Sequence, residues 1–152
     1  MIIIYTDGAA KGNPGPGGYG AVMMYGKHRK ELSKGFRLTT NNRMELLSVI
    51  EALEALNTDK IPVTIVSDSK YVVDSVTKGW IWNWQKKGFK DKANVDLWKR
   101  FIPLFNKYKP KFKWVKGHSG HEENERCDQL AVAAAEGRNL EVDTEYEQIK
   151  GR

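Results

Sequence analysis

Four acidic residues that lie far apart in the sequence are candidate ligands for divalent metal ions: Asp7, Glu45, Asp68 and Asp128. Two of them directly follow apolar, strand-like runs, at Thr6-Asp7 and Ser67-Asp68. If these runs are neighbouring parallel strands, both carboxylates emerge at the same edge of a sheet. Because neighbouring strands lie about 4.8 Å apart, the two carboxylates would be close enough to share a metal ion.

Each acid also has an ordinary structural interpretation. Asp7 begins a turn dipeptide, and Asp68 is of a residue type that often caps a helix N-terminus. Glu45 lies three residues after Asn42, and this capping-box spacing alone favours a capping role. Asp128 borders the inward face of an expected helix. Spacing along the sequence does not show whether the four acids converge.

The hydrophobic pattern predicts the elements that would carry these acids. Expected strands cover residues 1–6, 19–26, 29–38, 61–67 and 111–115, and expected helices cover residues 42–56, 69–77, 95–105 and 124–136. Their order predicts a single α/β domain with a mixed sheet, over residues 1–136. Residues 137–152 are polar, and we expect them to form a loose C-terminal tail.

A glycine-rich stretch near the N-terminus, GPGGYG at 15–20, matches the G-x-G-x-x-G fingerprint of dinucleotide-binding loops. That fingerprint works where the glycines open a helix, whose N-terminus holds the pyrophosphate. Here a strand-like run, a turn at Gly26-Lys27 and a second strand-like run follow instead. The pattern therefore indicates a hairpin whose glycines allow close backbone approach, and we expect no dinucleotide cofactor.

Residues 80–100, WIWNWQKKGFKDKANVDLWKR, combine aromatic and basic side chains. Lysines neutralise phosphates and aromatic rings pack against sugars or bases, so the segment is a candidate nucleic-acid contact. The alternative is that the tryptophans belong to the core and the lysines to a solvated face. Trp98 fits that alternative because it lies on a helical apolar stripe. For Lys86, Lys87 and Lys90 the pattern favours contact with nucleic acid.

Composition limits the other possibilities. The chain has 152 residues, a net charge of +6 and a single cysteine, so it contains no internal disulfide. No apolar stretch approaches the roughly 20 residues that cross a membrane, and the N-terminus shows no signal-peptide pattern. We therefore expect a cytoplasmic protein that does not contact membranes, with a monomer as the default state.

Together these motifs resemble type 1 ribonuclease H, and most closely the compact bacterial enzymes. The resemblance covers about residues 3 to 136, through the motifs YTDGAAKGNPGPGGYGAV, TTNNRMELLSVIEALEAL, SDSKYVVDSV, NVDLW and WVKGHSGHEENERCDQLA. It implies a mixed five-stranded sheet flanked by helices. It also implies hydrolysis of the RNA strand of RNA–DNA hybrids, leaving 5′-phosphate and 3′-hydroxyl ends.

In this family four carboxylates bind two magnesium ions, with manganese as a candidate substitute. The acids at the matching positions are Asp7, Glu45, Asp68 and Asp128. The resemblance thus replaces the capping role that spacing favours for Glu45. It implies that His118, in a glycine-rich loop, shuttles protons or assists product departure. Glu125, one helical turn before Asp128, is expected to tune metal occupancy or to act only as an acid at a helix N-terminus.

The resemblance also implies a set of substrate contacts. Residues expected along the groove are Asn13, Asn41, Asn42, Arg43 and Lys70. Trp80 and Asn94 are expected to hold the DNA strand, and Lys86, Lys87 and Lys90 lie in the basic protrusion found in many members of the family. Two features depart from the bacterial relatives, because the protrusion is shorter with fewer lysines and position 70 is lysine rather than glutamine. These departures bear on affinity for the hybrid more than on the chemistry.

Three alternatives stay open at this point. The fold could grip a hybrid without cutting it, although the complete set of acids and His118 favour cleavage. A dinucleotide-dependent oxidoreductase is disfavoured by the strand that follows the glycines. A zinc site built from His118, His121 and Cys127 lacks a Cys-x-x-Cys pair, and Cys127 is better explained as a small buried side chain.

Overall fold

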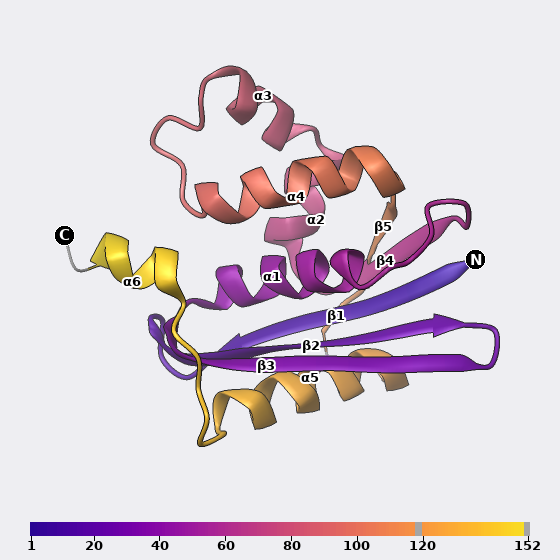
Figure 1. The fold of residues 1–152 in the computed structure, drawn as a ribbon, viewed down its shortest axis with the longest axis horizontal. Helices are drawn as coiled ribbons and strands as arrows, with labels where there is room; N and C mark the ends of the chain where they lie inside the picture. The colour runs from indigo at the N-terminus through magenta and orange to yellow at the C-terminus, as the bar shows by residue number, and fades with distance from the viewer. Residues whose placement is uncertain (118–119, 151–152) are drawn as a thin grey trace.

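Five strands and six helices form the part of the chain that the structure, a computed structural model, describes, namely residues 1–117 and 120–150 (Figure 1). The strands are β1 (Ile2–Ala10), β2 (Gly15–Tyr25), β3 (His28–Thr39), β4 (Val63–Ser67) and β5 (Lys111–Trp114). The helices are α1 (Asn41–Glu54), α2 (Lys70–Thr77), α3 (Trp80–Lys86), α4 (Val95–Tyr108), α5 (Glu122–Ala135) and α6 (Thr144–Lys150).

The strands form one mixed sheet in the order β3-β2-β1-β4-β5. The β1–β2 and β2–β3 pairs are antiparallel, whereas β1–β4 and β4–β5 are parallel. The parallel register aligns Thr6 with Ser67, so the acids that follow them leave the sheet at the same edge. The predicted mixed five-stranded sheet is confirmed, and so is the predicted neighbourhood of β1 and β4.

Helices cover both faces of the sheet. Figure 1 shows α5 beneath it and α1, α2 and α4 above it, with α3 farther out beyond α4. The core lies between the sheet and the upper helices, where Ile4, Ile65, Leu46 and Trp98 are each 0% exposed. The expectation that Trp98 belongs to the core is therefore confirmed. No helix in the described ranges is both long and apolar enough to cross a membrane.

The GPGGYG stretch lies within strand β2 rather than in a phosphate-binding loop. The chain turns at Gly26, which has a positive φ of 57°, and returns as β3, so the predicted hairpin is confirmed. A residue without a side chain is needed at Gly20, because a Cβ at this position would lie 2.4 Å from the carbonyl oxygen of Cys127. The missing side chain thus lets α5 lie directly against β2.

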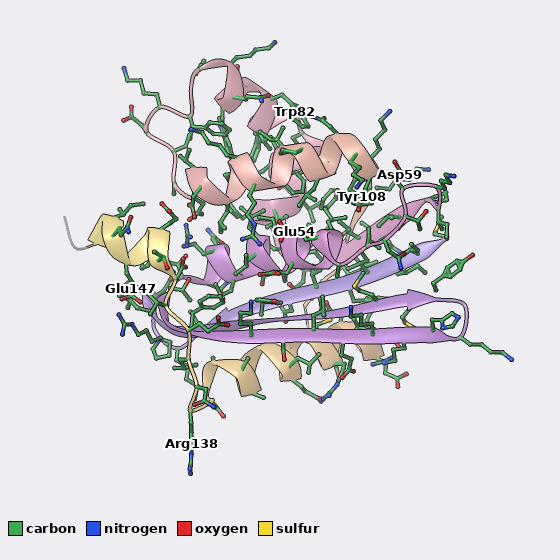
Figure 2. All side chains as sticks on the ribbon, viewed as in Figure 1. Glu54, Asp59, Trp82, Tyr108, Arg138 and Glu147 are labelled. Atoms are coloured by element: carbon green, nitrogen blue, oxygen red, sulfur yellow. The ribbon has the colours of Figure 1, made fainter. Side chains whose placement is uncertain are left out.

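Helix α3 was not expected from the sequence, and it places the aromatic residues of segment 80–100 in two environments. Trp82, labelled in Figure 2, and Trp84 are partly buried and pack against the hydrophobic core. The Trp82 ring lies 5.1 Å from that of Phe105, and the Trp84 ring lies 6.0 Å from that of Trp98. Trp80, in contrast, is 43% exposed. One tryptophan of this helix is therefore available to a ligand.

The C-terminal segment differs from the expected loose tail. The backbone N–H of Arg37 donates to the carbonyl of Glu141 at 2.9 Å, and Glu141 forms an isolated parallel bridge with Phe36. Helix α6 follows, and Glu147 on it accepts hydrogen bonds from Arg37 (Figure 2). The prediction was wrong because residues 137–152 contain few apolar residues, whereas docking here depends on backbone pairing and ion pairs with distant residues.

Candidate active site

Three carboxylates from separate elements meet at the edge of the sheet where β1 and β4 reach their C-terminal ends. One ligand oxygen each from Asp7, Glu45 and Asp68 lies within 4.8 Å of the others. Asp7 belongs to β1, Asp68 follows β4, and Glu45 lies in the second turn of α1. The sequence predicted that the first two acids would be neighbours, and the structure adds Glu45 to them.

Local structure explains how Glu45 reaches the strands. A Cβ on Gly8 would lie 2.3 Å from the backbone nitrogen of Glu45, so α1 packs against β1 only because residue 8 lacks a side chain. The cap of α1 is Thr40, whose hydroxyl accepts from the N–H of Arg43 at 3.2 Å. The capping role that spacing favoured for Glu45 is therefore wrong, and its carboxylate is available to a ligand.

Asp68 is likewise not a helix cap. The cap of α2 is Ser69, whose hydroxyl accepts from the N–H of Val72 at 3.2 Å. The end of β5 and the segment that follows it instead contact Asp68. The indole N–H of Trp114 donates to its carbonyl oxygen at 3.0 Å, and a Cβ on Gly117 would lie 2.9 Å from its Oδ2. These contacts fix the position of Asp68 at the strand end.

Burial and mutual repulsion make this group electrostatically unfavourable without a cation. Asp7 is 4% exposed and Glu45 6% exposed. Burial, opposed in part by a hydrogen bond with Glu45 and reinforced by the charge of Asp68, raises the pKa of Asp7 to about 7. Burial and the charge of Asp7 raise the pKa of Glu45 well above its usual value. Both carboxyls would ionise more readily beside a bound cation.

The donor set fits a hard divalent cation. The Oε2 atom of Glu45 is buried and has no hydrogen-bond partner among the described residues. A buried carboxylate oxygen without a partner is costly, and a metal ion would satisfy it. The three ligand groups are all carboxylates, the ligands that magnesium prefers. Asp7, Glu45 and Asp68 are therefore the residues that would hold such an ion.

Asp128 approaches the same place from α5, on the opposite face of the sheet. Its charge contributes to the raised pKa of Asp7, but its carboxylate is not part of the group within 4.8 Å. Its role as a fourth ligand stays a prediction. Glu125, one turn earlier, is exposed, and its effect on metal occupancy stays a prediction too. His118 lies outside the described residues.

Sequence reasoning missed Asn124. This residue lies on α5 one turn before Asp128, is 2% exposed, and its Oδ1 has no partner among the described residues. A signal was present in the sequence, because Asn124, Cys127 and Ala131 share the buried face of α5. A polar residue at such a position is unusual and marks it for inspection.

Most of the expected groove residues are exposed beside the carboxylates. Asn41 and Asn42 begin α1, and the Oδ1 atom of Asn13 accepts from the N–H of Asn41 at 3.2 Å. Lys70 is exposed at the start of α2. Asn94, just before α4, is half-buried and donates to the hydroxyl of Tyr71 at 3.0 Å. The lysines of the expected basic protrusion are all exposed, namely Lys86 at the end of α3 and Lys87 and Lys90 after it.

Arg43 is an exception to the predicted set of substrate contacts. Its side chain is only 3% exposed. The guanidinium donates to Asp96 at 2.8 and 2.9 Å and to Asp143 at 2.8 and 2.9 Å. Because its donors are directed into this buried cluster, the arginine side chain does not lie on the groove. The prediction that it contacts the substrate disagrees with this position.

Cys127 is 0% exposed, and its thiol donates to the carbonyl oxygen of Tyr5 at 3.2 Å. Burial raises the pKa of this thiol well above its usual value. The expectation of a small buried side chain is confirmed, and a thiol held protonated in this way is a poor zinc ligand.

Comparison with known proteins decides the family. The model of the RNase H family matches residues 1–136. The chain belongs to the RNase H family. The Ribonuclease H of Rippkaea orientalis is 54% identical over 151 residues, covering 96% of this chain and 92% of the relative. The Ribonuclease H of Desulforamulus reducens is 58% identical over 147 residues, covering 93% and 92%. Ribonucleases H are metal-dependent nucleases, which agrees with the carboxylate group.

Solved structures agree with this assignment. LC9-RNase H1, described as a type 1 RNase H with the type 2 active-site motif, superposes with a TM-score of 0.79 at 33% identity, covering 99% of this chain and 81% of that one. LC11-RNase H1, solved in complex with an RNA/DNA hybrid, gives a TM-score of 0.65 at 27% identity, covering 90% and 97%. The mixed five-stranded sheet flanked by helices is therefore the RNase H-like fold.

Proposed function

We propose that this chain hydrolyses the RNA strand of RNA–DNA hybrids with two magnesium ions, leaving 5′-phosphate and 3′-hydroxyl ends. The observation that carries the proposal is the group of Asp7, Glu45 and Asp68 within 4.8 Å, with a buried carboxylate oxygen that lacks a partner. Its position in a chain of the RNase H family connects this metal-binding geometry to nuclease chemistry. The LC11-RNase H1 complex with an RNA/DNA hybrid supports the choice of substrate.

In this proposal the three carboxylates hold the metal ions, and Asp128 approaches from α5 to complete the set. When bound, magnesium supplies activation of the attacking water and stabilisation of charge on the phosphate. The protein fixes the ligands in advance, since Asp7 and Asp68 end neighbouring parallel strands and Gly8 admits α1. His118 remains the predicted group for proton transfer.

The exposed amides at the start of α1 would recognise the RNA strand. The side chains of Asn13, Asn41 and Asn42 both donate and accept hydrogen bonds, as does a 2′-hydroxyl, which distinguishes RNA from DNA. The DNA strand would run toward α3, where Trp80 offers an exposed ring and the lysines beyond the helix offer positive charge. Asn94 would contribute a polar contact to the same strand.

The experiment that tests this function is cleavage of an end-labelled RNA–DNA hybrid with magnesium, with manganese or with EDTA. Double-stranded DNA, double-stranded RNA and single-stranded RNA of the same sequence serve as substrate controls. We expect metal-dependent cutting of the hybrid's RNA strand alone, with 5′-phosphate ends on the products. The variant Asp7→Asn should lose at least about 100-fold in rate, the order found when one electrostatic group of an active site is removed.

Two results would contradict the proposal. Cutting in EDTA would show that the carboxylates do not act through a metal ion. Tight binding to the hybrid without cutting, in either metal, would favour a non-cleaving hybrid-binding module of the same fold.

A further inference from the structure

Trp114 connects the edge strand β5 to the carboxylate group. Its indole N–H donates to the carbonyl oxygen of Asp68 at 3.0 Å, and the N–H of Val115 donates to the carbonyl of Ser67 at 3.0 Å. The ring is nevertheless 41% exposed, which is unusual for so large an apolar side chain. One edge of the indole is thus fixed beside the expected metal site while much of the ring remains accessible.

Lys70 lies against this ring. Its ammonium nitrogen is 5.0 Å from the centroid of the Trp114 ring, within the range of a cation–π interaction. The side chain is exposed, and no carboxylate within the described ranges forms an ion pair with it. Lys70 is also the first residue of α2, where the helix dipole disfavours a positive charge. A cation is therefore held two residues from Asp68 without an anionic partner.

The sequence on either side of Trp114 is strongly basic. Between residues 97 and 121 the sequence contains no acidic residue. The cations in that stretch are Lys99, Arg100, Lys107, Lys109, Lys111, Lys113 and Lys116. Lys111 and Lys113 are exposed on β5 itself, the edge strand that carries Trp114. Strand β5 therefore offers exposed positive charge to a polyanion that reaches the carboxylates along this edge.

We propose that Lys70 binds a backbone phosphate of the hybrid next to the metal-binding carboxylates, and that Trp114 is the positioning residue that holds its ammonium there. This inference rests on the proposed function, since it requires a hybrid seated over Asp7, Glu45 and Asp68. Lysine acts on a phosphate as a mobile point charge, whereas an amide at this position would read hydroxyls or base edges. The Trp114 ring limits that mobility and lowers the entropy lost on binding.

The test is the salt dependence of hybrid binding, measured by fluorescence anisotropy with magnesium in an Asp7→Asn background that does not cut. Each neutralised phosphate adds about 0.9 to the slope of log K against log salt concentration. We expect Lys70→Gln to reduce the slope by about 1. Lys70→Arg, which keeps the charge, should retain the slope. Lys27→Gln is the matched control, because Lys27 is an exposed lysine in the β2–β3 turn.

Variants of Trp114 separate its two contacts. Trp114→Leu removes the ring, so we expect the slope to fall as in Lys70→Gln, with little further loss when the two substitutions are combined. Trp114→Phe keeps a ring but lacks the N–H that donates to Asp68, so the slope should be retained. In the cutting-competent chain, Trp114→Phe should instead raise the magnesium concentration needed for half-maximal cleavage.

An unchanged slope in Lys70→Gln, or an equal reduction in Lys27→Gln, would overturn the inference. Additive effects of Trp114→Leu and Lys70→Gln would overturn the positioning role of Trp114. The unsubstituted chain is assayed for cleavage in parallel, which keeps the two proposals distinguishable. If it cuts hybrids while Lys70→Gln leaves the slope unchanged, only this inference fails. If it cuts nothing, the proposed function fails, whatever the slopes show.

Discussion

Two groups of buried charged side chains meet at the N-terminal end of α1, one at Arg43 and the other at Glu45. The two groups differ in the balance of positive and negative charge. Arg43 is enclosed by Asp96 and Asp143, so one cation meets two carboxylates through short hydrogen bonds. Glu45 meets Asp7 and Asp68, so three carboxylates have ligand oxygens within 4.8 Å of one another. The same turn of helix therefore carries one cluster in which both carboxylates contact a cation, here called the neutralised cluster, and one group of three like charges.

The pKa shifts follow this difference. Burial alone would raise the pKa of Asp96, but the hydrogen bonds and charge of Arg43 outweigh burial and lower it. Burial also raises the pKa of Asp7, and there the nearby charge of Asp68 adds to the effect. A buried carboxylate that contacts a cation inside the protein stays ionised, whereas a buried group of like charges would be stabilised by a bound cation. In this chain, charge balance rather than burial distinguishes the Arg43 cluster from the candidate metal site.

The largest expected effect comes from breaking the neutralised cluster. Arg43→Met leaves two carboxylates buried without their cation, which should lower the free energy of unfolding by about 3–5 kcal/mol. Urea denaturation with EDTA measures it. Arg138→Met is the matched control, because Arg138 points away from the body of the protein (Figure 2) and should change stability by less than about 0.5 kcal/mol. A loss below about 1 kcal/mol for Arg43→Met would contradict the comparison.

The second prediction concerns pH in the absence of metal. The folded-state pKa of Asp7 is raised to about 7, above its usual value near 4, so the folded chain binds this proton more tightly than the unfolded chain. That contribution to stability is fully present below about pH 4 and is lost as the pH rises through about 7. We expect the free energy of unfolding in EDTA to be at least about 1 kcal/mol greater at pH 5 than at pH 7.5.

Saturating magnesium provides the control for that trend, because bound cations neutralise the carboxylates and should flatten it. The neutralised cluster should give the opposite dependence of stability on pH. The pKa of Asp96 is lowered in the folded state, so its contribution is present above pH 4 and is lost as the pH falls through the folded pKa. Stability in EDTA that rises steadily from pH 5 to pH 7.5 would show that Asp7 is not strained by its neighbours.

A smaller effect is expected when one charge is removed from the group of Asp7, Glu45 and Asp68. Asp7→Asn relieves repulsion and should stabilise the metal-free fold by about 1 kcal/mol at pH 7.5. It should also weaken the pH trend, to which buried Glu45 still contributes. Denaturation midpoints in EDTA measure it, with exposed Asp59→Asn as the control (Figure 2). An equal or lower midpoint for Asp7→Asn would argue against the crowding of these carboxylates.

The smallest effect should come from an exposed ion pair on α6, the helix that begins directly after Asp143 of the neutralised cluster. Arg37 donates to both oxygens of Glu147, but the arginine side chain is 60% exposed and solvent screens the pair. We expect Glu147→Gln to leave the urea midpoint unchanged within error. A loss comparable to that of Arg43→Met would mean that docking of α6 depends on the surface pair rather than on Asp143.

The strands and the two acids at their ends could be predicted because the information is local. Each apolar run predicts a strand, and the acid at its end, Asp7 or Asp68, is a candidate metal ligand. The expected helix between the two strands makes a parallel crossover the simplest connection. The position of Glu45 could not be obtained in this way. Its spacing from Asn42 matches a cap, and only the packing of α1 against Gly8 shows that the carboxylate turns toward the strands.

Arg43 and the C-terminal segment were beyond local reasoning for a related reason. The partners of Arg43 lie 53 and 100 residues away in the sequence. Asp143 belongs to no motif, and the NVDLW motif that contains Asp96 does not indicate which cation it pairs with. Helix α6 is short and polar, so its docking depends on Asp143 and on backbone pairing at Phe36 rather than on an apolar stripe. Burial of a charged residue is decided by distant partners, which sequence spacing does not reveal.

Gly20 has a consequence for the geometry of the metal site. It is the cross-strand partner of Asp7, and α5, which carries Asp128, rests on it at the carbonyl of Cys127. Because residue 20 has no side chain, only backbone lies between the strand that carries Asp7 and the helix that carries Asp128. The methyl group added by Gly20→Ala would push α5, and with it Asp128, away from the sheet. All four candidate carboxylates would remain in the sequence. Loss of hybrid cleavage in a variant that still folds would reveal that displacement.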